Sequence, residues 1–365
     1  MGRRLGFSLA LFICLTLLAE PCFRLIPIVS SADRSRLAAT REYFLGRRVG
    51  TYEPWPFVGF RLSATFNPFM RSDGFTSTAN LPRERTRPSI RIAFIGGSTT
   101  FSAHTPSGMS PGYLTSFPYL VEQLLHRLRL PVEVLNCGVP GWTSVENLIH
   151  YELSIQDYAP DWVVIHQGAN DVKARSYRDF RSDYAHYRRA FAFPDPGLIE
   201  RFLVEHSDLY VWFLMRAHAI PQDVFDLCDR PLPPPKEVRL NPVGLETFRR
   251  NTANLVQLAE AGGARVLLTT ESHNRRPKPG EETRHGLRTG MDEENEAIRS
   301  LAREMHLPLA DTEVALDHHG SLFTDYVHVT LEGNRIKARV IAKALLRAGL
   351  RDGDRPGPRQ GRARL

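Results

Sequence analysis

Residues 90–100, which read IRIAFIGGSTT, decide the fold class. The first six residues form a short, mostly apolar run that ends at two glycines, a pattern typical of a strand buried in a parallel sheet. Apolar residues at helical spacing follow over residues 117–130, and a second apolar run covers residues 132–135. This order of strand, helix and strand predicts the first part of an α/β domain.

The same alternation continues towards the C-terminus. Residues 143–146 (TSVE) form a capping box that predicts a helix running to about residue 158. Further strands are expected at 161–166, 265–270 and 307–310, and further helices at 246–260, 291–305 and 331–348. Regular alternation of this kind predicts a central parallel sheet with helices on both faces.

Composition excludes several classes of protein. The chain has 365 residues, of which 42% are hydrophobic and 24% charged, so it is not a disordered, collagen-like or polytopic membrane protein. It carries 47 basic and 40 acidic residues, a formal net charge of +7. The excess is spread thinly, and no basic stripe on a folded element is visible. We therefore expect no nucleic-acid partner.

Four cysteines are present, Cys14, Cys22, Cys137 and Cys228, and no CxxC motif joins them. Zinc ribbons and thioredoxin chemistry are thereby disfavoured, and no metal site is expected. Cys137 and Cys228 either pair in an oxidising compartment or stay as buried free thiols. We favour the free thiols, because an unpaired cysteine is often simply a small buried apolar residue.

The N-terminus resembles an export signal. Arg3 and Arg4 precede residues 5–19, which carry no charge. Residues 1–32 therefore read as a signal peptide or as an uncleaved N-terminal membrane anchor, and a buried helix is the less favoured alternative. Either of the first two interpretations places the rest of the chain outside the cytoplasm, secreted or attached to the membrane by its N-terminus.

Between the ends, the pattern predicts one main domain at 88–350 preceded by an irregular N-terminal arm at 33–87. Within the domain, residues 172–241 are too long for a plain connection. We interpret them as a cap over the site in preference to inert decoration. Residues 351–365 hold five Arg and two Asp among Gly and Pro, and are expected to be a disordered basic tail.

Four loops carry residues that could take part in catalysis. Ser98 follows the first predicted strand, Gly138 the second and Asn170 the third, while Asp325 and His328 precede the last helix. Each signal alone is modest, since glycine turns and Asx turns are common. Ligands of parallel sheets bind outside the carboxyl ends of the strands, so the loops are expected to meet at one edge.

Together these residues would supply a complete set for nucleophilic catalysis. Ser98 offers a hydroxyl, and His328 offers a base whose tautomer Asp325 can fix from three residues away. Gly138 leaves its backbone N–H open to close approach, and Asn170 offers a side-chain amide donor. The conjunction predicts an acyl-transfer site with an oxyanion hole.

At this point the chain resembles the SGNH (GDSL-type) hydrolase family. The four blocks of that family match Ser98 in FIGGST, Gly138 in LNCGVPG, Asn170 in GAND, and His328 in the DxxH that begins at Asp325. One departure is a glycine, residue 97, where the family's Gly-Asp-Ser has Asp. The resemblance covers about residues 90–346, with no motif matching 172–241.

The resemblance implies a flavodoxin-like three-layer α/β/α sandwich and ester hydrolysis through an acyl-enzyme, without metal or cofactor. It assigns Ser98, Asp325 and His328 to catalysis, and Ser98, Gly138 and Asn170 to the oxyanion hole. The expected substrates are O-acyl esters, acetyl or short-chain, on a small molecule, carbohydrate or lipid.

Two alternatives remain open at this stage. An O-acyltransferase that modifies an extracytoplasmic polysaccharide would need the same catalytic groups, and a membrane-tethered binding module would keep the fold without turnover. Trp142, Tyr177 and Phe180 either stack on a sugar or pack internally.

Overall fold

The computed structural model describes residues 20, 21, 23, 31–65, 68–78, 81–86, 88–102, 112–189, 191–221, 223–231, 233, 239–275, 285–317 and 319–351. The chain divides into two compact units. The larger unit comprises Ala64–Arg188 and Arg230–Leu365, and the smaller comprises Met1–Ser63 and Arg189–Asp229.

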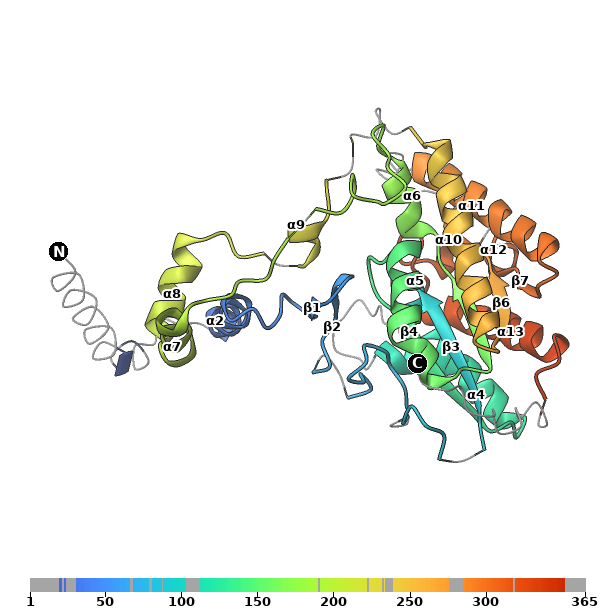
Figure 1. Ribbon diagram of the computed structural model, residues 1–365, viewed down its shortest axis with the longest axis horizontal. Helices are drawn as coiled ribbons and strands as arrows, with labels where there is room; N and C mark the ends of the chain where they lie inside the picture. The colour runs from blue at the N-terminus through green and yellow to red at the C-terminus, as the bar shows by residue number, and fades with distance from the viewer. Residues whose placement is uncertain are drawn as a thin grey trace. The chain divides into compact units, whose positions relative to one another are not determined.

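The larger unit is built on a five-stranded sheet (Figure 1). Its strands are β3 (Ile90–Gly96), β4 (Val132–Gly138), β5 (Trp162–His166), β6 (Arg265–Thr269) and β7 (Leu309–Ala310). All neighbours pair in parallel, in the order β4-β3-β5-β6-β7. This is the flavodoxin-like order, and the expected α/β sandwich is confirmed.

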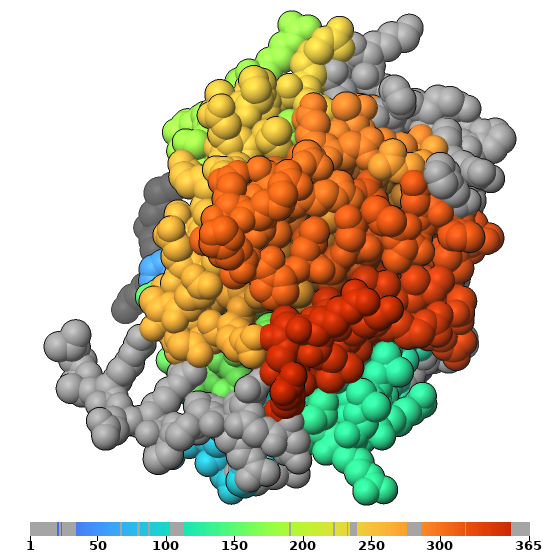
Figure 2. Space-filling view, turned by 90° about the vertical axis from the view of Figure 1, so that its right-hand side faces the viewer, coloured from blue at the N-terminus to red at the C-terminus, as the bar shows by residue number. Residues whose placement is uncertain are grey.

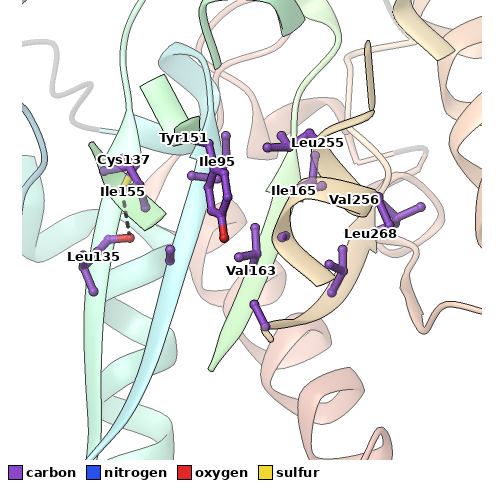
Figure 3. Packing of buried hydrophobic residues seen from close by; sticks show 14 of the residues in the cluster. Ile95, Leu135, Cys137, Tyr151, Ile155, Val163, Ile165, Leu255, Val256 and Leu268 are labelled. Atoms are coloured by element: carbon purple, nitrogen blue, oxygen red, sulfur yellow. Dashed lines mark hydrogen bonds between the residues drawn. The ribbon is translucent and has the colours of Figure 1, made fainter. Parts of the chain in front are cut away.

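Helices cover both faces because alternate strand residues point to opposite sides. On one face, Ile95, Val163 and Leu268 pack with α5 (Ser144–Leu153), α10 (Pro242–Ala261) and α11 (His285–Glu304), as Figure 3 shows in part. On the other, Phe94 and Val164 pack with α4 (Phe117–Arg127) and α13 (Leu331–Arg347), which lie side by side in Figure 2. The remaining elements of this unit are short: α3 (Ser98–Phe101), η1 (Gly112–Thr115), η2 (Ile155–Tyr158), α6 (Ala169–Arg175), α12 (Thr312–Leu316) and η5 (Gly320–Leu322).

The smaller unit corrects the prediction of an irregular arm at 33–87. It contains α2 (Ser31–Phe44), the antiparallel pair β1 (Tyr52–Trp55) and β2 (Gly59–Leu62), α7 (Leu198–His206), α8 (Asp208–Ala217) and α9 (Phe225–Cys228). Leu37 of α2 is buried in a cluster with Val204 and Val211, far away in sequence. Because those partners are distant, local periodicity alone did not reveal the helix.

The boundary predicted at residue 88 also shifts. Residues 64–87 belong with the sheet, where Thr76 and Asn136 exchange two backbone hydrogen bonds of 2.9 Å at the β4 edge. The stretch predicted as an insertion, 172–241, is split, since only Arg189–Asp229 joins the smaller unit. That it caps the site stays a prediction.

The inserted segment leaves and re-enters the sheet unit at one place. The N–H of Arg230 donates to the carbonyl of Tyr187 at 3.0 Å, within the larger unit. On the other side, the N–H of Arg189 donates to the carbonyl of Cys228 at 2.7 Å, within the smaller unit. The two connections are therefore held together by a short antiparallel contact.

Both ends of the chain fall largely outside the described residues. The uncharged run 5–19, with the signal peptide or anchor predicted there, lies outside them, and so does the predicted basic tail beyond Arg351. Among the helices that are described, none combines the length and apolar character needed to cross a bilayer. Cys137 and Cys228 are both buried and free, as expected.

A lysine lies buried inside the sheet unit. Lys337 of α13 is fully buried, with Nζ 3.4 Å from Nε2 of His166 at the end of β5. Thr269 donates its hydroxyl hydrogen to Ile165, so the 2.7 Å contact between Thr269 and His166 Nδ1 has the histidine as donor. Nε2 is then free to accept from Lys337. Burial lowers the pKa of Lys337 to about 8, although the negative charge of Glu271 partly raises it.

The lowered pKa of Lys337 predicts a pH-dependent stability. Between pH 8 and the unfolded value of about 10.4 the unfolded chain binds more protons than the folded one, so the free energy of unfolding rises with pH. Lys337→Met is expected to reduce this rise. Urea denaturation from pH 7 to 10 measures it, with Lys343→Met on the exposed side of α13 as the control. Equal slopes for wild type and Lys337→Met would contradict the prediction.

Candidate active site

The predicted site residues lie on loops at the carboxyl edge of the sheet. Ser98 comes two residues after β3, Gly138 ends β4, and Asn170 lies at the start of α6, just after β5. Asp325 and His328 lie on the loop before α13. The strand order reverses between β3 and β5, which is where such sheets form a crevice for ligands.

Ser98, His328 and Asp325 form a continuous hydrogen-bonded chain. The Ser98 Oγ lies 2.8 Å from His328 Nε2, and His328 Nδ1 lies 2.7 Å from Asp325 Oδ2. An ionised carboxylate only accepts, so Nδ1 carries the proton and Nε2 accepts from the serine hydroxyl. This is the arrangement in which a neutral imidazole can remove the hydroxyl proton.

Asp325 is held in its charged form. Its Oδ1 accepts hydrogen bonds from the backbone N–H groups of Val327 at 2.9 Å and His328 at 2.8 Å. Burial alone would raise the pKa of Asp325, but its hydrogen bonds and its electrostatic interaction with His328 outweigh burial and lower the pKa well below its usual value. The lowered pKa keeps the carboxylate ionised at neutral pH, where it fixes the orientation of the imidazole.

Ser98 is placed at the first position of the short helix α3. The first N–H groups of a helix have no acceptor within it, because the chain lacks a preceding turn. The backbone N–H groups of Thr100 and Phe101 donate to the carbonyl of Gly97. Ser98 precedes both donors in the chain, so its N–H is not one of the hydrogen bonds within the helix. The Ser98 amide is thus positioned close to its own hydroxyl, as an oxyanion donor requires.

Gly138 ends β4, and its predicted role as an oxyanion donor stays a prediction. Its N–H donates to Asn136 Oδ1 at 3.1 Å. A Cβ at residue 138 would lie 2.3 Å from the backbone nitrogen of Phe101, so the glycine lets α3 pack directly against the end of β4. The structure therefore shows Gly138 as a close-packing residue whose amide has an internal acceptor.

Asn170 lies beside the nucleophile loop. Its Nδ2 donates to the carbonyl of Trp142 at 2.9 Å, which leaves the second hydrogen of the amide for another acceptor. A Cβ at Gly97 would lie only 2.8 Å from the same Nδ2. The glycine that departs from Gly-Asp-Ser therefore allows Asn170 to sit closely against the loop that bears Ser98.

Glu271, on the loop after β6, is a residue that motif reasoning missed. One carboxylate oxygen accepts from the hydroxyl of Thr99, next to the nucleophile, and the other accepts from the N–H of Ala169 at 2.6 Å, next to Asn170. Its own backbone is fixed by Asn295, which accepts at 2.7 Å and donates at 2.9 Å. A buried carboxylate thus joins the serine loop to the asparagine loop. A polar residue directly after a buried strand was the one signal for it.

Two of the three aromatic residues considered for sugar stacking are buried. Trp142 and Tyr177 are buried, and Tyr177 donates its hydroxyl to the carbonyl of Arg230 at 2.6 Å. Phe180 packs beside Tyr184 and His186. Of the two readings that the sequence left open, internal packing is correct for Trp142 and Tyr177.

Solved structures with similarity to this chain include hydrolases. One is an acetylxylan esterase from Geobacillus stearothermophilus, 19% identical, with a TM-score of 0.44 over 72% of this chain and 96% of that one. Another is a GDSL-like lipase from Bacteroides thetaiotaomicron, 17% identical, with a TM-score of 0.41 over 71% of this chain and 88% of that one. No curated protein sequence matches the chain.

A family model gives the assignment. Residues 94–336 match the GDSL-like lipase/acylhydrolase family, a segment that includes Ser98, Gly138, Asn170, Asp325 and His328. The matched residues run from β3 to the second turn of α13 and so include all the loops that bear the predicted site residues. The chain is an ester-bond hydrolase and belongs to the GDSL-like lipase/acylhydrolase family.

Proposed function

We propose that this enzyme hydrolyses O-acyl esters with acetyl or short acyl chains through an acyl-enzyme at Ser98. The observation that carries the proposal is the hydrogen-bonded chain from Ser98 through His328 to Asp325, with contacts of 2.8 and 2.7 Å. No group other than these three side chains is needed to activate the serine.

The reaction proceeds in two halves. His328 Nε2 takes the hydroxyl proton as the Ser98 Oγ attacks the ester carbonyl, and then passes that proton to the departing alkoxide, which leaves as the alcohol. Water, deprotonated by the same imidazole, attacks the acyl-serine. The second tetrahedral intermediate expels the Ser98 oxygen, which recovers the proton as the carboxylic acid is released. Asp325 stays ionised and stabilises the imidazolium in both halves.

The oxyanion is proposed to meet two main donors. One is the backbone N–H of Ser98 at the start of α3, and the other is the second hydrogen of the Asn170 amide. The N–H of Gly138 becomes a third donor only when it exchanges Asn136 Oδ1 for the substrate oxygen. Donors that are already fixed in place need little rearrangement as charge develops.

The proposed location is outside the cytoplasm, as the uncharged run after Arg3 and Arg4 suggests. Acylated glycans and lipids at the cell surface are esters that an extracytoplasmic enzyme would meet. The proposed substrates are therefore a carbohydrate or a lipid that carries O-acetyl or short O-acyl groups.

Removing the nucleophile or the base tests the chemistry. Ser98→Ala and His328→Ala are expected to lower kcat on an activated acetate ester by about 10⁴–10⁶-fold, because the members of such a triad act as a unit. Ser321→Ala and His319→Ala, both exposed, serve as matched controls. A fluorophosphonate should label the wild type and not Ser98→Ala. Full hydrolysis by Ser98→Ala would exclude the proposal.

Loss of the side-chain oxyanion donor has a smaller effect. Asn170→Ala is expected to reduce kcat by about 10²–10³-fold, the usual consequence of losing one donor. KM should change little, because the donor is strengthened in the transition state and not in the bound ester. Steady-state kinetics with a chain-length series of activated esters gives both constants. An unchanged kcat would show that Asn170 is not a donor.

Glu271 is expected to act as a positioning residue. Glu271→Ala removes both acceptors and is expected to lower kcat by about 10²-fold, since a displacement near 1 Å has effects of this size. Glu271→Gln keeps an oxygen for the Ala169 N–H and an amide donor for the Thr99 hydroxyl, so it should recover most of the activity. The rate of fluorophosphonate labelling at Ser98 should follow kcat. Equal activity in the two variants would contradict the positioning role.

A further inference from the structure

The helix pair α7 and α8 exposes an unusual amount of apolar surface. On α7, Leu198, Ile199 and Phe202 are 88, 51 and 46% exposed. Their spacing places them on one face of the helix, separate from the buried Leu203 and Val204. The exposed His206 stacks on Phe202 within this face, with 4.5 Å between the ring centroids. Three large exposed apolar side chains on one face are nevertheless unusual for a solvated helix.

The outer side of α8 has the same character. Phe213 is 57% exposed, and its neighbours Leu209 and Trp212 are only half-buried. Arg216 stacks over the ring of Trp212, with 5.2 Å between the guanidinium carbon and the ring centroid. Large apolar side chains with a tryptophan and an arginine at the margin are typical of helices that lie in the interfacial region of a bilayer.

The end of the uncharged N-terminal run is attached to this helix pair. Glu20, the residue directly after 5–19, is buried, and its carboxylate accepts from the Ser207 hydroxyl at 2.7 Å and from the Asp208 N–H at 2.7 Å. Phe23 contacts Trp212, with ring centroids 6.1 Å apart. Glu20, the residue that follows the segment predicted to enter a membrane, is therefore bound at the first turn of α8.

Two of the three carboxylates on α7 and α8 are neutralised by arginines. The carboxylates of Glu205 and Asp208 are paired with Arg47 at 2.7 Å and Arg41 at 2.5 Å. Arg216, at the exposed end of α8, lies beside the apolar side chains. Arginine next to exposed aromatic and aliphatic groups suits lipid headgroups that carry negative charge.

We propose that the outer faces of α7 and α8, defined by Leu198, Ile199, Phe202, Leu209, Trp212 and Phe213, lie on the surface of a lipid bilayer that contains anionic lipids. The side chains enter the boundary between headgroups and acyl chains, and the arginine remains at headgroup level. This contact is additional to any insertion of residues 5–19, and it does not depend on the reaction at Ser98.

Site-specific fluorescence on the full chain tests the proposal. An environment-sensitive fluorophore is placed by Phe202→Cys or Phe213→Cys, in a chain in which Cys14 and Cys22 are replaced by Ser. Cys137 and Cys228 are buried and are spared by native labelling. Leu128→Cys and Val314→Cys, at exposed apolar positions of the larger unit, are the matched controls.

Vesicles of phosphatidylethanolamine and phosphatidylglycerol are then added. We expect the fluorescence emission of labels at residues 202 and 213 to shift to the blue and to lose intensity when the lipids carry quenchers. Labels at 128 and 314 should show no change. Labels at 202 and 213 that stay in water, whether the protein floats with the vesicles or not, would overturn the proposal. A blue shift without lipid would also overturn it, and its dependence on protein concentration would show whether a second copy or the chain's own segment covers the face.

Discussion

The imidazole of His328 is the point on which the catalytic arrangement depends. One ring nitrogen bonds to Asp325 and the other to Ser98. Asp325 is three positions from His328 in the sequence, whereas Ser98 is 230 positions away. The near contact is supplied by a tight loop whose backbone N–H groups also bond to Asp325. The far contact exists only because β3 and the loop before α13 reach the same edge of one sheet. Closing so long a loop is unfavourable, and the two apolar layers of the sheet provide the compensating stability.

Around that imidazole, the loops are fixed to one another by contacts outside the chain from Ser98 to Asp325. Glu271 joins the serine loop to the asparagine loop, and the absence of a side chain at Gly97 lets Asn170 approach. Gly138 packs against Phe101, so that β4 supports the short helix bearing the nucleophile. The site is thus preorganised by contacts between loops as much as by the strands beneath them.

Much of this was predictable from the sequence, for a physical reason. Buried parallel strands such as 90–96 are continuous apolar runs, and the helices between them have regular apolar spacing, so local pattern is enough to give the sheet and its active edge. Four short blocks then sufficed to place Ser98, Asn170, Asp325 and His328. The hydrogen bond from the Gly138 amide to Asn136 was not predicted, because no spacing in the sequence reveals that contact.

The features that were not predicted from the sequence depend on contacts between residues far apart in the chain. Helix α2 is stabilised by Val204 and Val211, and Glu271 gains its role only when two other loops arrive beside it. Residues 172–241 looked like one insertion, yet only Arg189–Asp229 leaves the sheet unit, to join the N-terminal segment. Pairing between segments so far apart leaves no periodic trace in either of them.

The hydrogen bond between Arg230 and Tyr187 has a consequence for how the polypeptide is assembled. It brings together the two points where the inserted segment departs and returns, so the sheet unit is nearly continuous across them. Insertion of new sequence into that segment, or its exchange for another module, would leave the path of the hydrolase core unaltered, which makes this junction a natural place for the architecture to diversify.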